Sequence, residues 1–200
     1  MKKLFFLLFL LSGMLVPNGY STEPRKQLLP VSVFSLQYAG STGFMTGGYF
    51  RSTRNAKLQT GLLYGYTPEY FGGVLHTLSL KALYNPFKIK LNEAFFVEPV
   101  QVGAFLCQNF GEDLDPTWSS TYPKGYYWWT PSLRGHVFIS SAVSLRSPNS
   151  SLLDHTSFYF EANTNDLYLS SYLVRKNYSS LSLYDIVFFG MGLKFYLRHE

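Results

Sequence analysis

The stretch that most constrains the fold is Ser182 to Leu197, which reads SLYDIVFFGMGLKFYL. Every second residue from Val187 to Leu197 is apolar, whereas the positions between them include Gly190, Gly192 and Lys194. Because side chains alternate across a strand, this pattern predicts one apolar face about 11 residues long, which suits a tilted strand that crosses a bilayer. An apolar face backed by small and charged residues is typical of a transmembrane β-barrel strand.

Within this stretch, Gly192 is followed by aromatic and apolar residues at Phe195 and Leu197. The arrangement resembles the C-terminal assembly signal of bacterial outer-membrane barrels. Leu63–Pro68 and Asn165–Leu169 are similar to segments of small outer-membrane proteins. These resemblances imply a bacterial outer-membrane location, with outer-membrane lipid and lipopolysaccharide as surroundings. They also imply that the barrel-assembly machinery binds the C-terminal strand, and they imply no activity.

The N-terminal residues have the organisation of a secretory signal. Lys2 and Lys3 precede an apolar run from Leu4 to Val16, and small residues follow at Gly19 and Ser21. A spanning helix needs roughly 18 to 20 apolar residues, so the run is too short for a membrane anchor. We therefore expect a cleaved signal peptide at residues 1–21 and one barrel domain at residues 22–200.

The composition of the remaining chain is unlike that of a soluble surface. Aromatic residues make up 18% and charged residues only 14% of the sequence, against roughly 25% charged residues in ordinary globular proteins. No later apolar run is long enough for a membrane helix, and only a closed barrel otherwise satisfies its backbone in lipid. A soluble secreted barrel or sandwich is the competing fold, but it would need another layer to cover its apolar strand faces.

Charge and cysteine content exclude several function classes. Without Lys2 and Lys3 the 17 basic residues become 15, against 12 acidic ones, which is too small an excess to indicate nucleic-acid binding. Cys107 is the only cysteine, so an intramolecular disulfide and a zinc cluster of several thiolates are excluded. We expect no cofactor and no metal.

Eight strand-like segments predict an all-β fold, an antiparallel transmembrane up-and-down β-barrel. An even strand number places both termini and the short turns in the periplasm, and the longer loops outside. Ten strands are the alternative if residues 109–131 add a hairpin, and Asn165–Ser180 is open between an extended strand and a short helix. Pro99 predicts a bulge. The segments are Val31–Ala39, Phe44–Ser52, Lys57–Tyr66, His76–Tyr84, Phe95–Cys107, Leu133–Arg146, Thr156–Asn163 and the stretch described first.

Polar residues on the second face of these strands predict a filled, closed interior, because eight strands leave room for little more than side chains. We expect Glu161 to pair with Arg134 or His136 on the neighbouring strand, since unpaired buried charge is costly. The expected role is that of a monomer with a structural or surface-interaction function. The predicted interior network is Lys81, Gln101, Arg134, His136, Glu161 and Lys194.

An enzymatic alternative comes from His155 and Ser157, which share one face of a strand and have Asp154 and Glu161 nearby. The pair resembles the His-x-Ser element of outer-membrane lipid A deacylases. That resemblance implies an acyl-ester hydrolase with Ser157 as nucleophile, His155 as general base and Glu161 as orienting acid. The residue after the serine is Phe158 where that family has asparagine, and the pair falls at the periplasmic end although the substrate lipid is in the outer leaflet.

The longest segment without alternation, residues 109–131, is rich in aromatic residues. Tyr and Trp make efficient recognition contacts, so one hypothesis is a binding module that acts through this loop. The other is a loop that folds over the barrel mouth or lies at the lipid headgroups. The candidate binding residues are Trp118, Tyr126, Tyr127, Trp128 and Trp129.

Overall fold

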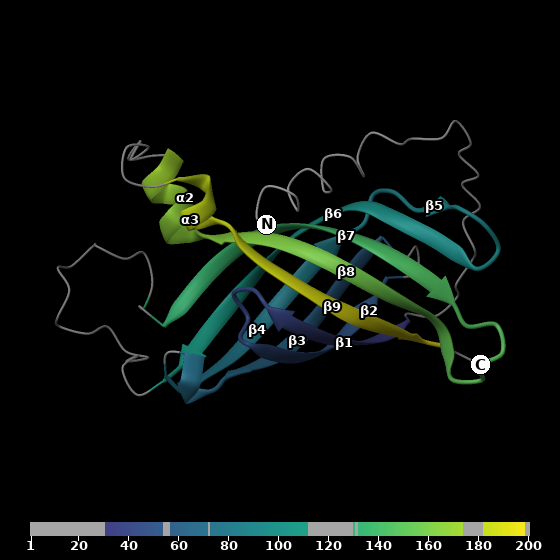
Figure 1. Ribbon diagram of the computed structural model, residues 1–200, viewed down its shortest axis with the longest axis horizontal. Coiled ribbons are helices and arrows are strands. Elements are labelled where there is room, and N and C mark those ends of the chain that lie inside the picture. The colour runs from purple at the N-terminus through teal and green to yellow at the C-terminus, as the bar shows by residue number, and fades with distance from the viewer. Residues whose placement is uncertain are drawn as a thin grey trace.

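A computed structural model describes residues 31–53, 57–71, 73–111, 130, 132–173 and 182–198. The chain in these ranges forms nine strands and three short helical segments, arranged as a barrel with helices at one end (Figure 1). The strands are β1 (Ser32–Ala39), β2 (Met45–Ser52), β3 (Leu58–Thr67), β4 (Leu75–Tyr84), β5 (Ile89–Lys90), β6 (Phe95–Phe110), β7 (Leu133–Arg146), β8 (Leu153–Asn165) and β9 (Phe188–Leu197). The helical segments are η1 (Glu69–Phe71), α2 (Asp166–Leu173) and α3 (Leu183–Ile186).

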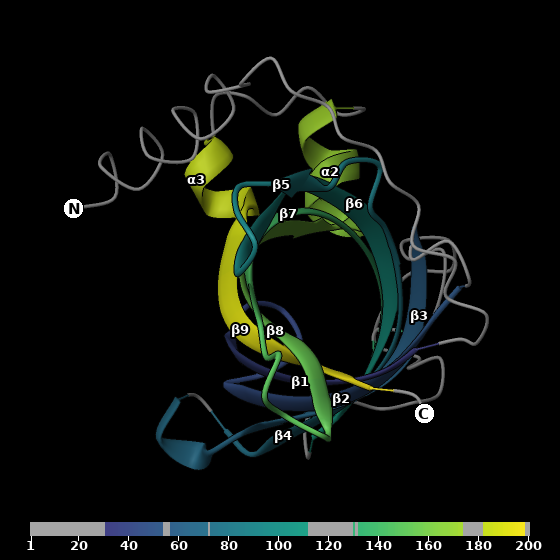
Figure 2. The same cartoon turned by 90° about the vertical axis from the view of Figure 1, so that its right-hand side faces the viewer.

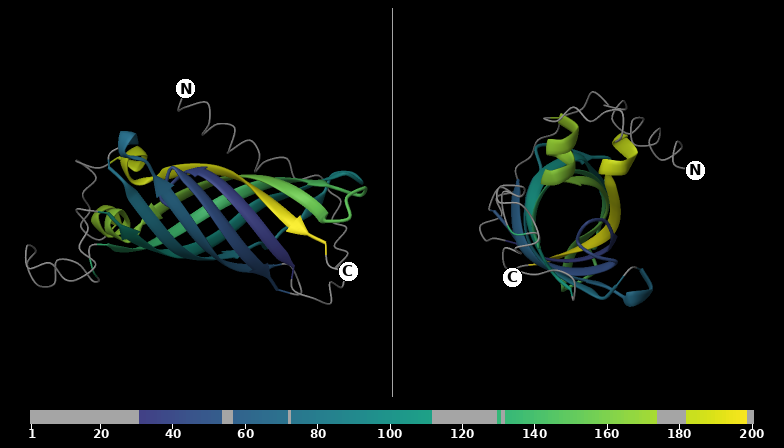
Figure 3. Two further views of the ribbon diagram at one scale, coloured as in Figure 1. Left: turned by 90° about the horizontal axis from the view of Figure 1, so that it is seen from below. Right: turned by 90° about the vertical axis from the view of Figure 1, so that its left-hand side faces the viewer.

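Eight of these strands close into an antiparallel ring, which confirms the predicted fold class. The sheet order is β4-β3-β2-β1-β9-β8-β7-β6-β5, and the pairing of β4 with β6 closes it. β5 contains two residues and pairs with the start of β6 beside the ring. Seen nearly end-on, the strands surround a single lumen (Figure 2), and from the side they are strongly tilted (Figure 3).

The strand bounds follow the predicted alternation closely. β7 coincides with the predicted segment, and β6 continues three residues beyond Cys107 to Phe110. The open question at Asn165–Ser180 is answered in part by α2, since a helix begins directly where β8 ends. The ten-strand alternative concerns residues 109–131, most of which lie outside the described residues.

A bulge interrupts the pairing of β6 with β7 at Pro99, as expected. Glu98 lies opposite Ala142 and Gln101 lies opposite Ser140, so β6 carries one extra residue between them. An extra residue reverses which side chains face inward. Glu98 before the bulge and Gln101 after it are therefore both buried in the lumen.

The two faces of the barrel wall differ sharply in polarity. Phe189 and Met191 on β9 are 62% and 41% exposed on the outside, as the alternation predicts. Lys194 and Tyr196 on the same strand are buried inside. Other exposed apolar side chains on the strands include Leu36, Leu62, Leu80, Leu106, Val137, Val143, Phe158 and Phe160. Buried polar ones include Ser35, Gln37, Thr77, Ser79, Gln101, Ser140, Ser144 and Asn163.

The two ends of the barrel are unlike. We call the end where β1, β3, β6 and β8 begin the turn end, and the opposite one the loop end. The helices α2 and α3 and the segment η1 lie at the loop end (Figure 1). A tight turn joins β7 and β8 at the turn end, where the Ser150 amide donates a hydrogen bond to the carbonyl oxygen of Ser147. The two longest connections between strands of the ring, residues 111–132 and 166–187, both join strand ends at the loop end.

Candidate functional site

The interior of the barrel gathers the side chains that could carry chemistry. Lys81, Gln101, His136, Glu161 and Lys194 are all buried there, whereas the sixth member of the predicted network, Arg134, is half-buried near the loop end of β7. Because the eight strands bring these groups into a space without bulk water, their partners decide how stable the arrangement is.

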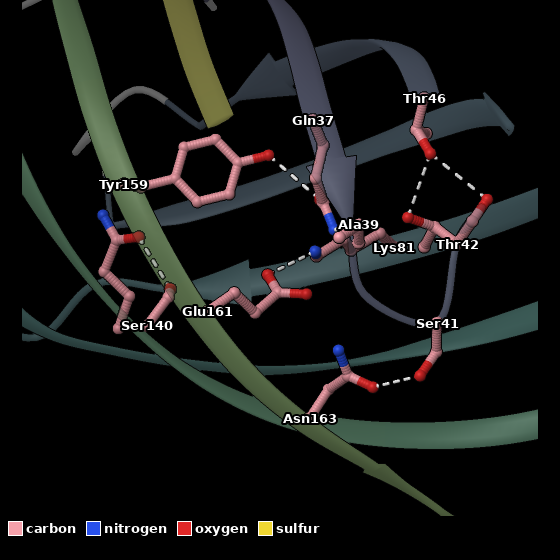
Figure 4. Close-up of polar contacts among 11 residues, drawn as sticks. Gln37, Ala39, Ser41, Thr42, Thr46, Lys81, Ser140, Tyr159, Glu161 and Asn163 are labelled. Carbon is pink, nitrogen blue, oxygen red and sulfur yellow. Dashed lines mark hydrogen bonds and ion pairs between the residues drawn. The ribbon is translucent and has the colours of Figure 1, made fainter. Parts of the chain in front are cut away.

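One ion pair crosses the lumen from β4 to β8. The Nζ atom of Lys81 lies 2.5 Å from Oε2 of Glu161, and both side chains are almost completely buried (Figure 4). The Lys81 ammonium also lies over the rings of Phe105 and Phe138, at 5.2 and 4.3 Å from their centres. The cation is thus held by one carboxylate and two aromatic faces.

The prediction that Glu161 pairs with Arg134 or His136 is wrong, and the strand register explains why. Glu161 lies opposite Ser140, whereas His136 lies opposite Asn165, four residues further along β8. Four strand residues span about 13 Å, so the neighbouring histidine is out of reach. The lumen is narrow enough that a lysine from the opposite wall is closer.

A second buried carboxylate, Glu98, was not predicted. The side chain of Asn85 donates a hydrogen bond to its Oε1 atom at 2.6 Å, and that of Gln101 donates to Oε2 at 2.7 Å. Ser140 in turn donates to Oε1 of Gln101 at 3.0 Å. Strict alternation back from Gln101 places Glu98 on the outside, and only the reversal of parity at Pro99 brings it in.

The loop between β1 and β2 folds into the loop end of the lumen. Ser41 donates a hydrogen bond to Oδ1 of Asn163 on β8 at 2.5 Å, and Thr77 on β4 donates to the carbonyl oxygen of Thr42. Thr42 is fully buried. The hydroxyl of Thr46 lies 3.1 Å from that of Thr42 (Figure 4). The loop therefore contacts two strands across the barrel and occupies its mouth.

Two tyrosines extend this internal bonding toward the middle and the turn end. The hydroxyl of Tyr159 on β8 donates to Oε1 of Gln37 at 3.0 Å (Figure 4). The amide of Gln59 on β3 donates to the hydroxyl of Tyr196 on β9 at 3.1 Å. The Lys194 ammonium lies over the rings of Phe50 and Tyr159. Hydrogen bonds and aromatic contacts thus connect opposite walls at several levels.

The residues of the enzymatic alternative lie together in sequence but not in a catalytic arrangement. Nδ1 of His155 lies 2.9 Å from Oδ2 of Asp154, and its ring stacks on Tyr196. The hydroxyl of Ser157 is hydrogen-bonded to that of Ser144 at 2.5 Å, and Glu161 binds Lys81. Among the described contacts, no hydrogen bond joins His155 to Ser157. Both side chains are buried, so these groups pack the turn end of the barrel.

A hollow of about 490 Å³ lies on the outer wall beside α2. Its lining includes the outward-facing Leu80, Leu106 and Val137, and Leu169 from the helix. The small residues Ala82, Ala104 and Gly135 also line the hollow, so no large side chain projects from the wall at these positions. The surface is almost entirely apolar, so it suits hydrocarbon rather than a polar ligand.

The chain matches no protein-family model, no curated protein and no solved structure. The resemblances to small outer-membrane proteins and to lipid A deacylases therefore stay predictions.

The remaining observations concern metal ligands, membrane helices and the predicted segments outside the described residues. Within the described ranges no group of three or more His, Cys, Asp and Glu side chains could hold a metal ion. No helix in those ranges is long and apolar enough to span a membrane. The predicted signal at residues 1–21 lies outside the described residues, as do the loop candidates Trp118, Tyr126, Tyr127, Trp128 and Trp129.

Proposed function

We propose that this chain is an integral β-barrel protein of a bacterial outer membrane, with a closed interior and a structural or surface-interaction role. The observation that carries the proposal is the polarity of the wall. Large apolar side chains such as Leu36, Leu62 and Phe189 are more than half exposed on the outside, whereas Lys81 and Glu161 are buried inside. A soluble protein shows the reverse order.

The size of the apolar exterior adds to this support. Soluble monomers rarely expose a continuous apolar patch of more than a few hundred Å². Here exposed apolar side chains occur on every one of the eight strands of the ring, so the patch becomes a belt around the whole barrel. In water such a belt would drive aggregation, but in a bilayer it meets hydrocarbon. The hollow beside α2 would then be filled by lipid chains.

The interior supports a closed barrel rather than a pore. The Lys81–Glu161 pair and the Gln59–Tyr196 hydrogen bond each cross the lumen, and Thr42 occupies one mouth. Eight strands leave an interior that side chains fill. A transport function therefore has no path in the described residues, which leaves the outer surface and the loops as the working parts of the protein.

We propose that the surface interaction uses residues 109–131, which connect strands at the loop end. β6 ends at Phe110 and β7 begins at Leu133, so both ends of this segment are anchored at the loop end of adjacent strands. Its tyrosines and tryptophans have the chemistry of recognition surfaces. The deacylase alternative gains nothing from the contacts of Ser157 and His155, which bind other partners.

Fractionation with a gel-mobility assay tests the proposal. The protein should sediment with outer membranes and resist extraction by alkaline carbonate. Its unboiled sample should migrate differently from the boiled one, because an intact barrel resists denaturation in cold detergent. A soluble periplasmic protein processed in parallel is the control. Recovery in the soluble fraction without detergent, at a single mobility, would refute the membrane proposal.

A further inference from the structure

Among the described residues, the exposed charges at the two ends of the barrel differ in sign. Six basic side chains are exposed at or beside the turn end, where the acidic ones are Glu93, Asp154 and the buried Glu98. At the loop end the described charged residues are Glu69, Asp166 and Asp185, with Arg134 as the single cation. Closing a barrel does not require this asymmetry. We call the six cations the basic ring: Arg51, Lys57, Lys88, Lys90, Arg146 and Arg198.

Three arginines of the basic ring form no ion pair with a carboxylate of the described residues, although Arg146 lies close enough to Glu93 to help lower its pKa. Arg51 donates from Nη1 to the hydroxyl of Ser32 at 2.9 Å, and Arg198 donates from Nη2 to the carbonyl oxygen of Ser147 at 3.3 Å. Arg146 is exposed at the last position of β7. The hydrogen-bond partners of Arg51 and Arg198 are both neutral, so they orient the guanidinium groups without cancelling their charge. Guanidinium groups bind phosphate in a bidentate manner.

Lys90 provides an internal contrast. Its Nζ atom lies 2.7 Å from Oε1 of Glu93, and this ammonium holds the pKa of Glu93 below its usual value. The pair is neutral as a unit and exposed to solvent. Lys90 therefore adds little to the net charge of the ring, whereas none of the three arginines forms an ion pair of this kind with a described carboxylate.

The positions of these arginines favour a partner that surrounds the barrel over a protein that binds on one side of it. In the ring order β1-β2-β3-β4-β6-β7-β8-β9, the strand of Arg51 (β2) and the strand of Arg146 (β7) are four places apart, on opposite sides of the barrel. A protein that docks on one side would reach only part of the ring. A layer of lipid headgroups reaches all of it.

Outward tyrosines lie close to the basic ring on two strands. Tyr49 is exposed on the outside of β2, two residues before Arg51, and Tyr84 is exposed at the last position of β4. Outward tyrosines at strand ends mark the level at which hydrocarbon meets headgroups. In the proposed membrane orientation, the guanidinium of Arg51 would therefore reach the depth of lipid phosphates.

We propose that the basic ring binds the phosphate groups of anionic phospholipids in the leaflet at the turn end. This inference rests on the proposed membrane function and adds a ligand class to it. Cations at a membrane surface gain about fivefold in affinity for anionic lipid per charge, and the gain is screened by salt. Each of the three arginines should therefore favour an anionic headgroup over a neutral one by up to about fivefold at low ionic strength.

The test uses the full-length protein in phosphatidylcholine vesicles at low salt. Electron spin resonance then compares how strongly spin-labelled phosphatidylglycerol and phosphatidylcholine associate with the barrel. The native protein should prefer phosphatidylglycerol, and 1 M salt should abolish the preference. The triple variant Arg51→Gln, Arg146→Gln, Arg198→Gln should lose it at low salt. The control Lys90→Gln, Glu93→Gln removes a neutral pair from the same ring and should keep it.

Each result decides between the two proposals. A barrel that inserts, with a heat-dependent gel mobility, but shows equal association of both lipids would overturn the ring inference alone. The same holds for a preference that persists in the triple variant or at 1 M salt, or for selective binding of a soluble acidic protein. Failure to insert into any vesicle would overturn both proposals. The salt response of the native protein decides the matter even if the triple variant does not fold.

Discussion

Removing either partner of the Lys81–Glu161 pair should leave an unpaired charge inside the barrel. Breaking a buried ion pair in this way costs about 3–5 kcal/mol. The two losses should differ, because Lys81 keeps the rings of Phe105 and Phe138 when Glu161 is changed. Glu161 has no comparable second contact when Lys81 is changed, since its Oε1 atom has no hydrogen-bond partner. We expect Glu161→Gln to lower the free energy of unfolding by about 3 kcal/mol, and Lys81→Met to lower it by about 5 kcal/mol.

The double variant Lys81→Met, Glu161→Gln should lose less unfolding free energy than the two single variants lose in sum. With both charges gone, neither desolvation penalty remains, and we expect a coupling of about 2–3 kcal/mol. Urea unfolding of the barrel in detergent micelles, followed by gel mobility and circular dichroism, gives the four free energies. The m-values should agree among the variants, so that midpoints report stability.

Lys90 and Glu93 supply the matched control. Their atoms lie 2.7 Å apart, at nearly the same separation as the internal pair, but both side chains are in water. The corresponding cycle, Lys90→Met and Glu93→Gln, should show no measurable coupling. If the Lys81–Glu161 cycle were additive within about 0.5 kcal/mol, the lumen would have to be hydrated and the account of a dry, closed interior would be wrong.

Two further predictions test the wall and the mouth. Leu193→Arg, on the outward face midway along β9, should destabilise the barrel in vesicles by about 2–4 kcal/mol, against about 0–1 for Leu58→Arg at the turn end. Equal losses in a denaturant titration would contradict the proposed membrane depth. Gly65→Ala should cost about 1–3 kcal/mol, because its Cβ would overlap the carbonyl oxygen of Thr42. Gly47→Ala meets nothing within 4 Å and should unfold at the native midpoint, so equal midpoints for both variants would disprove that close packing.

Sequence alone predicted most of the wall, because alternation is a local property. Each barrel strand has one face that meets an apolar environment, so the pattern in a segment such as Leu133–Arg146 fixes both its bounds and its orientation. The expected bulge at Pro99 has the same local origin. Helix α2 was not decided by sequence, since its residues DLYLSSYL alternate poorly and show little helical amphipathicity.

The contacts inside the lumen were predicted less well, because they depend on register and on distances across the barrel. Polar residues were correctly placed inside, but the partner of Glu161 comes from a strand on the far wall. Glu98 was missed because one extra residue at Pro99 changes its side of the strand. If the reversal of inward and outward positions at the Pro99 bulge is applied to the sequence, Glu98 is placed inside the barrel. The burial of Thr42 had no comparable signal in the sequence.

The seam between β1 and β9 has a consequence for biogenesis. These strands pair from Val33 to Ala39 against Tyr196 to Gly190, with Leu36 opposite Leu193, yet they come from opposite ends of the described chain. Until β9 arrives, β1 and β8 each present a bare edge of amide and carbonyl groups that hydrocarbon cannot solvate. If the membrane proposal holds, an incomplete chain therefore gains no partial stability in the bilayer. Insertion and closure should be a single cooperative event, which favours delivering the last strand to its place before the others leave water.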